Sequence, residues 1–151
     1  MKTNPVVDFF QTMIGQSMGK GPSPLAKWLN GTLVSAEEGT LSAEYEVREE
    51  MCNPGRILHG GVSAAIMDDL IGATVFTLGN PALYSSINLN IDYLYSVPVG
   101  KKVIAQAHII RAGKKVVHAE CKIFDEHQNI VAKATSNLVA TSRSVGSNTE
   151  A

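Results

Sequence analysis

The chain has few cysteines, and they are not arranged for metal binding or redox chemistry. Cys52 and Cys121 are the only two in 151 residues, and they lie in different segments without Cys-x-x-Cys spacing. That spacing is typical of zinc sites and thioredoxin-like motifs. His108, His118 and His127 are also scattered, without the spacing of metal ligands. We therefore expect reduced thiols and no metal site.

The chain has almost no net charge and no long uninterrupted apolar run. Its formal charge is -1 and it contains no long basic stretch, which argues against a nucleic-acid partner. The longest apolar region, residues 62–78, contains Asp68 and Asp69 and is short for a membrane span. Residues 1–8 contain no apolar stretch typical of a signal peptide. We predict a cytoplasmic protein without a membrane partner.

The composition, with 44% hydrophobic residues and no evident internal repeat, predicts one globular domain. Helical spacing predicts helices over residues 5–14, with Asn4 as cap, and over residues 60–78. A glycine- and proline-rich loop is expected between the first helix and the first strand, and the small, polar C-terminal tail is expected to be disordered. The predicted strands are residues 25–35, 40–48, 83–95, 102–111, 115–125 and 130–141.

The order of these elements predicts an α+β fold in which an antiparallel six-stranded sheet wraps around a long central helix. Short turns separate the last four strands, which favours antiparallel neighbours. The helix of residues 60–78 is apolar on nearly every face and must be enclosed. One sheet covers only one side of it, so we expect the chain to form a homodimer.

A glycine-rich turn directly precedes this helix and predicts the active site. Gly60 and Gly61 allow a ligand to approach the backbone, and the first N–H groups of the helix favour an oxygen that becomes negative during reaction. Asp68 and Asp69 follow in an apolar setting, where ionised groups are costly unless they are paired or functional.

At Asn53, Gly55, His59-Gly60-Gly61, Asp68 and Ser86, the sequence resembles the hotdog-fold thioesterases, in particular the phenylacetic-acid-degradation type of acyl-CoA thioesterase. The resemblance spans roughly residues 25–141. It implies a hotdog domain over those residues, preceded by an N-terminal helix and loop over residues 1–24 and followed by the tail of residues 142–151. It also implies a homodimer or dimer of dimers.

The implied activity is hydrolysis of an acyl- or aryl-CoA thioester to a free acid and coenzyme A, with no cofactor beyond the coenzyme A of the substrate. Asp68 is then the nucleophile or general base, Gly61 with Gly60 holds the thioester carbonyl, and Ser86 orients the water or holds the aspartate. Ser85 is a rival for the last role.

Gly60 and Asp68 are eight residues apart, or about 12 Å along one helix. One chain therefore does not easily supply both groups to one thioester. If the glycines of one subunit face Asp68 of the other, a dimer holds two composite sites, which is also what the resemblance implies.

The other candidate site residues each have two possible roles, and the sequence does not choose between them. Asn53 either hydrogen-bonds the substrate or braces the turn, and His59 either donates to the thioester or positions the loop. Arg111, Lys114 and Lys115 either bind the phosphates of coenzyme A or form a solvated hairpin tip. An acyl tunnel is expected to draw on these apolar side chains: Phe9, Phe10, Met13, Val62, Ile66, Leu70 and Phe76.

Two alternatives compete with the hydrolase. A catalytically silent module that binds acyl-CoA or acyl-carrier protein would keep the fold and the dimer without turnover. A hotdog dehydratase or hydratase would use a histidine with an acid to move a proton on the acyl carbons. The position of His59 beside Gly60 and Gly61 does not resemble the motif of those enzymes.

Overall fold

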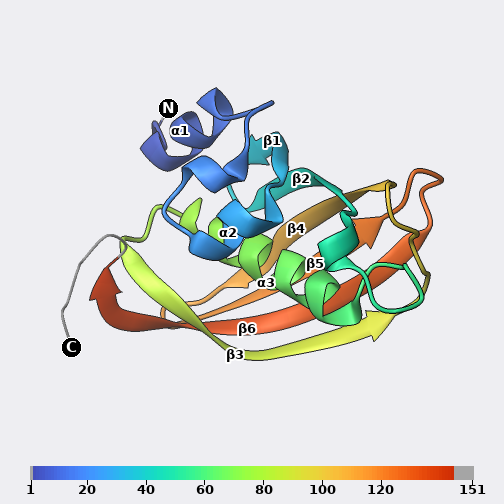
Figure 1. Ribbon diagram of the computed structural model, residues 1–151. Helices are drawn as coiled ribbons and strands as arrows, with labels where there is room; N and C mark the ends of the chain where they lie inside the picture. Colours follow the sequence, from blue (N-terminus) through green and yellow to red (C-terminus); the bar gives the residue numbers. More distant parts are fainter. Residues whose placement is uncertain (1, 145–151) are drawn as a thin grey trace.

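The computed structural model describes residues 2–144 of the chain (Figure 1). The helices and strands in chain order are α1 (Pro5–Thr12), η1 (Met18–Lys20), α2 (Pro24–Leu29), β1 (Thr32–Glu37), β2 (Thr40–Glu46), η2 (Glu49–Met51), α3 (Gly60–Phe76), β3 (Ala82–Tyr93), β4 (Lys102–Ala112), β5 (Val116–Phe124) and β6 (Ile130–Ser144). None of the helices within this described part is long and apolar enough to cross a membrane.

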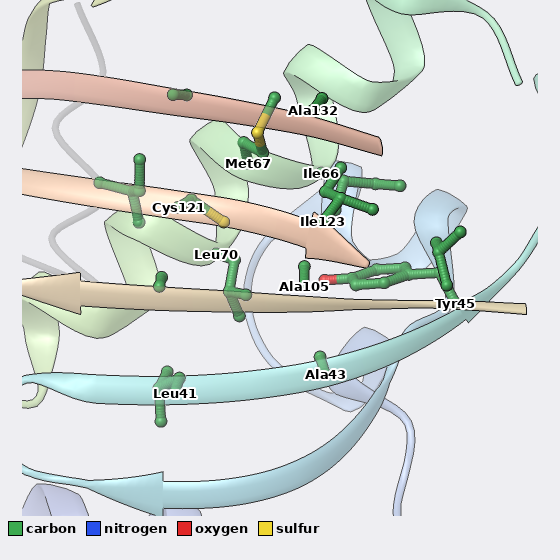
Figure 2. Packing of buried hydrophobic residues seen from close by; sticks show 14 of the residues in the cluster. Leu41, Ala43, Tyr45, Ile66, Met67, Leu70, Ala105, Cys121, Ile123 and Ala132 are labelled. Carbon is green, nitrogen blue, oxygen red and sulfur yellow. The ribbon is translucent and has the colours of Figure 1, made fainter. Parts of the chain in front are cut away.

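The six strands form one antiparallel sheet in the order β1-β2-β4-β5-β6-β3. The sheet curves around α3, as Figure 1 shows, and this confirms the predicted hotdog arrangement. Figure 2 shows Ile66, Met67 and Leu70 of α3 packed against the sheet, where all three are fully buried. Small buried side chains such as Ala105 let the helix lie close to the strands.

The first helix and the central helix are both where the sequence predicts them. The Asn4 side chain accepts from the N–H groups of Val6 and Val7, each at 3.2 Å, and so caps α1. Gly79, with a φ of 80°, follows the end of α3 and turns the chain towards β3.

The predicted strand over residues 25–35 is wrong in its first half, which is helix α2. The Ser23 hydroxyl accepts from Ala26 N–H at 3.1 Å, Pro24 occupies the first turn, and Asn30 ends the helix in the left-handed region with a φ of 53°. The guanidinium of Arg48 donates to the carbonyls of Trp28 and Leu29 and so satisfies the C-terminal end. A cap at each end therefore makes a six-residue helix stable here.

The expectation that β3 and β4 are neighbours is also wrong, because β3 pairs with β6 at the far edge of the sheet. The segment that links β3 to β4 is anchored elsewhere. Leu58 N–H donates to the Val97 carbonyl at 2.8 Å, and Gly100 N–H donates to the Val47 carbonyl at 2.8 Å. These bonds hold the link against the turn before α3 and against the end of β2, so no hairpin forms.

The last strand extends further than the sequence predicts. Ser144 at the end of β6 pairs with Ala82 of β3, so residues 142–144 are ordered strand and not part of a disordered tail. The remaining part of the predicted tail, residues 145–151, lies outside the described residues.

Candidate active site

The turn before α3 is held by hydrogen bonds among its own residues. The Asn53 side-chain oxygen accepts from Gly55 N–H at 2.9 Å, and Arg56 N–H donates to the Asn53 carbonyl at 2.9 Å. The His59 ring caps the helix, because its Nδ1 accepts from Gly61 N–H at 2.8 Å. Asn53 and His59 thus brace the turn, which is one of the two roles predicted for each.

The two glycines of the turn differ in what their N–H groups do. The Gly61 N–H is engaged by His59, whereas Gly60 is the first residue of α3 and has no preceding helical carbonyl to pair with its N–H. The Tyr93 hydroxyl donates to the Gly60 carbonyl at 3.0 Å. A Cβ at position 60 would lie 3.2 Å from the Tyr93 ring, so the missing side chain permits this close contact.

The middle of α3 carries Asp68, which is held by a strand. The Ser86 hydroxyl of β3 donates to Asp68 Oδ1 at 3.0 Å. Of the two adjacent serines, Ser86 is therefore the one directed at the aspartate. The register between β3 and β6 shifts between Ser86 and Asn88, and such irregularities commonly occur beside functional sites because they redirect side chains.

The neighbouring Asp69 is held by a different element. The Ser23 hydroxyl, which also caps α2, donates to Asp69 Oδ1 at 3.0 Å. Burial raises the pKa of Asp69, the hydroxyl of Ser23 partly opposes this effect, and the negative charge of Asp68 adds to it. Sequence reasoning did not find Ser23, although the Ser-Pro pair that starts α2 was a visible cap signal.

A cavity of about 420 Å³ opens beside both carboxylates, and Ser23 and Ser86 also line it. Its other lining residues are mostly apolar and come from α1, the segment between α1 and α2, α2, β1, α3, β3 and β6: Phe9, Phe10, Met13, Met18, Gly21, Pro22, Leu25, Ala26, Leu33, Gly72, Ala73, Val75, Phe76, Ala82, Leu83, Tyr84 and Leu138. Of the predicted tunnel residues, Phe9, Phe10, Met13 and Phe76 line this cavity. Ile66 and Leu70 are fully buried in the core instead, and Val62 does not line it.

The remaining predicted residues are not brought to this cavity. Gly60 lies about 12 Å from Asp68 along the helix axis, and none of the turn residues lines the cavity as the described residues form it. Arg111, Lys114 and Lys115 are exposed around the β4–β5 hairpin, away from the lining. A single subunit therefore presents its carboxylates and its glycine turn at separate places.

Histidines and thiols elsewhere are part of the sheet or its surroundings. His108 lies within hydrogen-bond distance of Thr40 and His118 of Asn137. Both cysteines are free thiols, and burial raises the pKa of Cys121 to about 12. Among residues 2–144, no cluster of three or more histidine, cysteine or acidic side chains is suited to hold a metal ion.

Comparison with known proteins points to one family. A family model described as the thioesterase superfamily matches residues 55–132. Acyl-coenzyme A thioesterase 13 of Homo sapiens is 30% identical over 112 residues, which cover 74% of this chain and 75% of that protein.

Two solved structures share the fold. One is a putative thioesterase of Ralstonia eutropha JMP134 described as related to phenylacetic acid degradation, with a TM-score of 0.73 and 27% identity over 81% of this chain and 94% of that one. The other is the PaaI protein from the phenylacetic acid degradation operon of E. coli, with a TM-score of 0.75 and 20% identity over 81% and 87% of the two chains. The resemblance found in the sequence is thereby confirmed.

Proposed function

Because this chain belongs to the thioesterase superfamily, we propose that it hydrolyses acyl-CoA thioesters to a free acid and coenzyme A. The observation that carries the proposal is Asp68, a carboxylate fixed by Ser86 at the edge of a mostly apolar cavity. A cavity of this kind suits an acyl group, and because Asp68 lines the cavity we assign the reacting end of that group to its carboxylate. The name of the human relative supports the choice of a coenzyme A thioester.

Asp68 drives the attack on the thioester carbon. Ser86 occupies Oδ1, which leaves Oδ2 to take a proton from water or to attack the carbonyl itself. Both routes require an ionised Asp68 held in one orientation. A fixed carboxylate of this kind needs no rearrangement at the moment of reaction.

The Gly60 N–H is the donor that we assign to the thioester carbonyl. It stands at the positive end of α3, where a developing oxyanion is stabilised. The sequence favoured Gly61 for this role, but the Gly61 N–H already donates to His59. His59 and Asn53 then act by positioning this turn, and Gly61 anchors it.

A homodimer brings the two parts of the site together. The edge strand β3 spans twelve residues and exposes large apolar side chains, with Leu83 at 44%, Ile87 at 58% and Tyr93 at 55% exposure. Long apolar edges of this kind favour pairing with another chain. We propose that two copies pair along β3, so that the glycine turn of one subunit faces Asp68 of the other. Pairing of dimers into a tetramer stays a prediction.

Binding of the coenzyme A phosphates by Arg111, Lys114 and Lys115 stays part of the proposal, as does a cytoplasmic location. These three basic side chains surround the exposed β4–β5 hairpin, so phosphates can reach them without rearrangement of the sheet. No cofactor enters the proposed reaction, because the carboxylate and the backbone N–H supply its chemistry.

The test compares Asp68→Asn with Asp69→Asn on a panel of acyl-CoA esters, with released thiol as the readout. Asparagine keeps an oxygen that accepts from Ser86 or Ser23, so both variants preserve the local hydrogen bond. We expect kcat to fall about 10³-fold in Asp68→Asn and less than about tenfold in Asp69→Asn. A parent protein that binds these esters without hydrolysing them would instead support a silent binding module, and equal losses in both variants would remove the special role of Asp68.

A further inference from the structure

Gly72 is a glycine in the interior of α3 that neither packing nor backbone conformation explains. A Cβ added at Gly72 would meet nothing within 4 Å, whereas a Cβ at Gly31 would lie 2.4 Å from the Tyr45 ring. Gly79 and Gly100 have positive φ angles, but Gly72 has ordinary helical geometry. Glycine weakens a helix interior relative to alanine. Gly72 is exposed, and the open space beside it is the feature that needs a reason.

That space belongs to the cavity beside the proposed catalytic carboxylate. Gly72 lies four residues after Asp68, so the two positions fall on the same face of α3 one turn apart. Both residues line the cavity, together with Ala73. A larger side chain at position 72 would project into the volume that lies next to Asp68.

The rest of the lining defines which chemical group fits there. Phe9 and Phe10 of α1 and Leu25 of α2 contribute apolar surface, and the polar groups are confined to the two aspartates and nearby hydroxyls. No lysine, arginine or histidine lines the cavity among the described residues. An acyl group with its own carboxylate would meet the charge of Asp68 and find no cation to pair with.

We propose that Gly72 is a specificity-determining residue that leaves room for an uncharged apolar acyl group. The group extends from the thioester at Asp68, past Gly72, towards the surface formed by α1 and α2. A volume of about 420 Å³ is within the range of cavities that enclose a small organic ligand, and it exceeds the need of an acetyl group. This inference rests on the proposed thioesterase function and names its substrate class.

The experiment measures kcat/KM of the parent, Gly72→Leu and Gly72→Ala for acetyl-, octanoyl-, phenylacetyl- and succinyl-CoA. We expect the parent to prefer the octanoyl or phenylacetyl ester over the acetyl and succinyl esters, and the preferred ester identifies a linear or an aromatic group. In Gly72→Leu the ratio of the preferred ester to acetyl-CoA falls by about tenfold or more, because leucine fills the space. Gly72→Ala is the matched control, since it adds one methyl group, and its ratio changes less than about threefold.

Each of the other outcomes overturns either the inference about Gly72 alone or the proposed thioesterase function as well. An unchanged ratio in Gly72→Leu, or a parent that prefers acetyl- or succinyl-CoA, overturns the inference and leaves the thioesterase function standing. Loss of the dimer in Gly72→Leu, seen by size-exclusion chromatography, places Gly72 at a subunit contact and overturns the inference as well. A parent that hydrolyses none of the four esters overturns the proposed function and this inference with it. If Gly72→Leu does not fold, Gly72→Met takes its place as an unbranched, flexible side chain of similar size, and the same fall in the ratio is expected. An unchanged ratio in that variant overturns the inference.

Discussion

The two ends of the proposed site are built in opposite ways. At the start of α3, the hydrogen bonds that shape the turn of residues 53–61 join close neighbours, such as Gly61 N–H and His59 two residues away. Distant partners, such as Tyr93 and Val97, bond to the turn from outside. In the middle of α3, the aspartates are held by distant partners, with Ser86 eighteen residues and Ser23 forty-six residues away. The shape of the first end is therefore largely a local motif that a sequence displays, whereas the second end exists only once the sheet and α2 are in place.

The two ends also supply complementary chemistry. The turn offers backbone N–H groups at the positive end of a helix, and the middle offers carboxylates beside an apolar cavity. Thioester hydrolysis requires both, yet they lie about 12 Å apart in one subunit. Variants at each end separate what the two ends contribute.

After the loss expected for Asp68→Asn, the largest effect is expected at the turn. Gly60→Pro removes the N–H group that we assign to the carbonyl, while proline is well tolerated at the first position of a helix. His59, with a φ of -66° and a ψ of 136°, already has the backbone conformation required before proline. We expect kcat to fall about 100-fold, as for loss of one oxyanion donor.

Gly60→Ala is the matched control for this change. It places a Cβ against the same Tyr93 ring but keeps the N–H group. We expect it to retain most of the activity of the parent. If the alanine and proline variants lose activity equally, the close contact with Tyr93 matters and the N–H group does not.

A smaller effect is expected where β3 holds the catalytic carboxylate. Ser86→Ala removes the hydroxyl that fixes Asp68 Oδ1 and lowers kcat by about tenfold through loss of orientation, with KM little changed. Ser85→Ala is the control, since its hydroxyl lies one strand position away and on the other face. Comparable losses in the two serine variants would contradict the positioning role of Ser86.

The smallest effect concerns how Asp69 makes the free energy of unfolding depend on pH. Its pKa is raised in the folded protein, so the folded state binds the proton more tightly than the unfolded chain does. The free energy of unfolding therefore falls as pH rises from the unfolded pKa near 4 through the raised value. Asp69→Asn removes this loss of stability, so we expect its stability relative to the parent to be greater at pH 7 than at pH 3. The difference is small because Asp69 is only partly buried.

Urea denaturation at a series of pH values measures this difference. Glu50→Gln is a control of opposite sign, because hydrogen bonding to Arg48 lowers the pKa of the exposed Glu50. The stability of that variant relative to the parent falls as pH rises. If Asp69→Asn shows the same direction as Glu50→Gln, the burial of Asp69 is not its dominant influence.

The same contrast between local and distant contacts explains what the sequence revealed. The long helix followed from its uninterrupted apolar pattern, and six strands were expected from alternation and turns. Helix α2 was missed although Leu25, Trp28 and Leu29 have helical spacing, because six residues are too few for that spacing to stand out from the strand that follows. The caps at its two ends are the stronger signal. The pairing of β3 with β6 was missed because alternation within a strand does not specify its partner.

The site follows the same rule. Asp68 and Ser86 were named through resemblance, and the hydrogen bond between them confirms that the fold brings these two residues together. Ser23 has no motif that links it to Asp69, since the link depends on how α2 packs against α3. The hydrogen bond from Gly61 N–H to His59 Nδ1 depends on the orientation of the His59 ring, which no residue pattern specifies.

The central claim is that each active site takes its carboxylate from one subunit and its glycine turn from the other. The most direct test purifies a heterodimer of Asp68→Asn and Gly60→Pro chains through two different tags. One of its two composite sites is intact, so we predict about half the activity of the parent dimer, although each variant alone is nearly inactive. A stable heterodimer as inactive as the Asp68→Asn and Gly60→Pro homodimers would contradict the claim, because it would show that both groups act within one subunit.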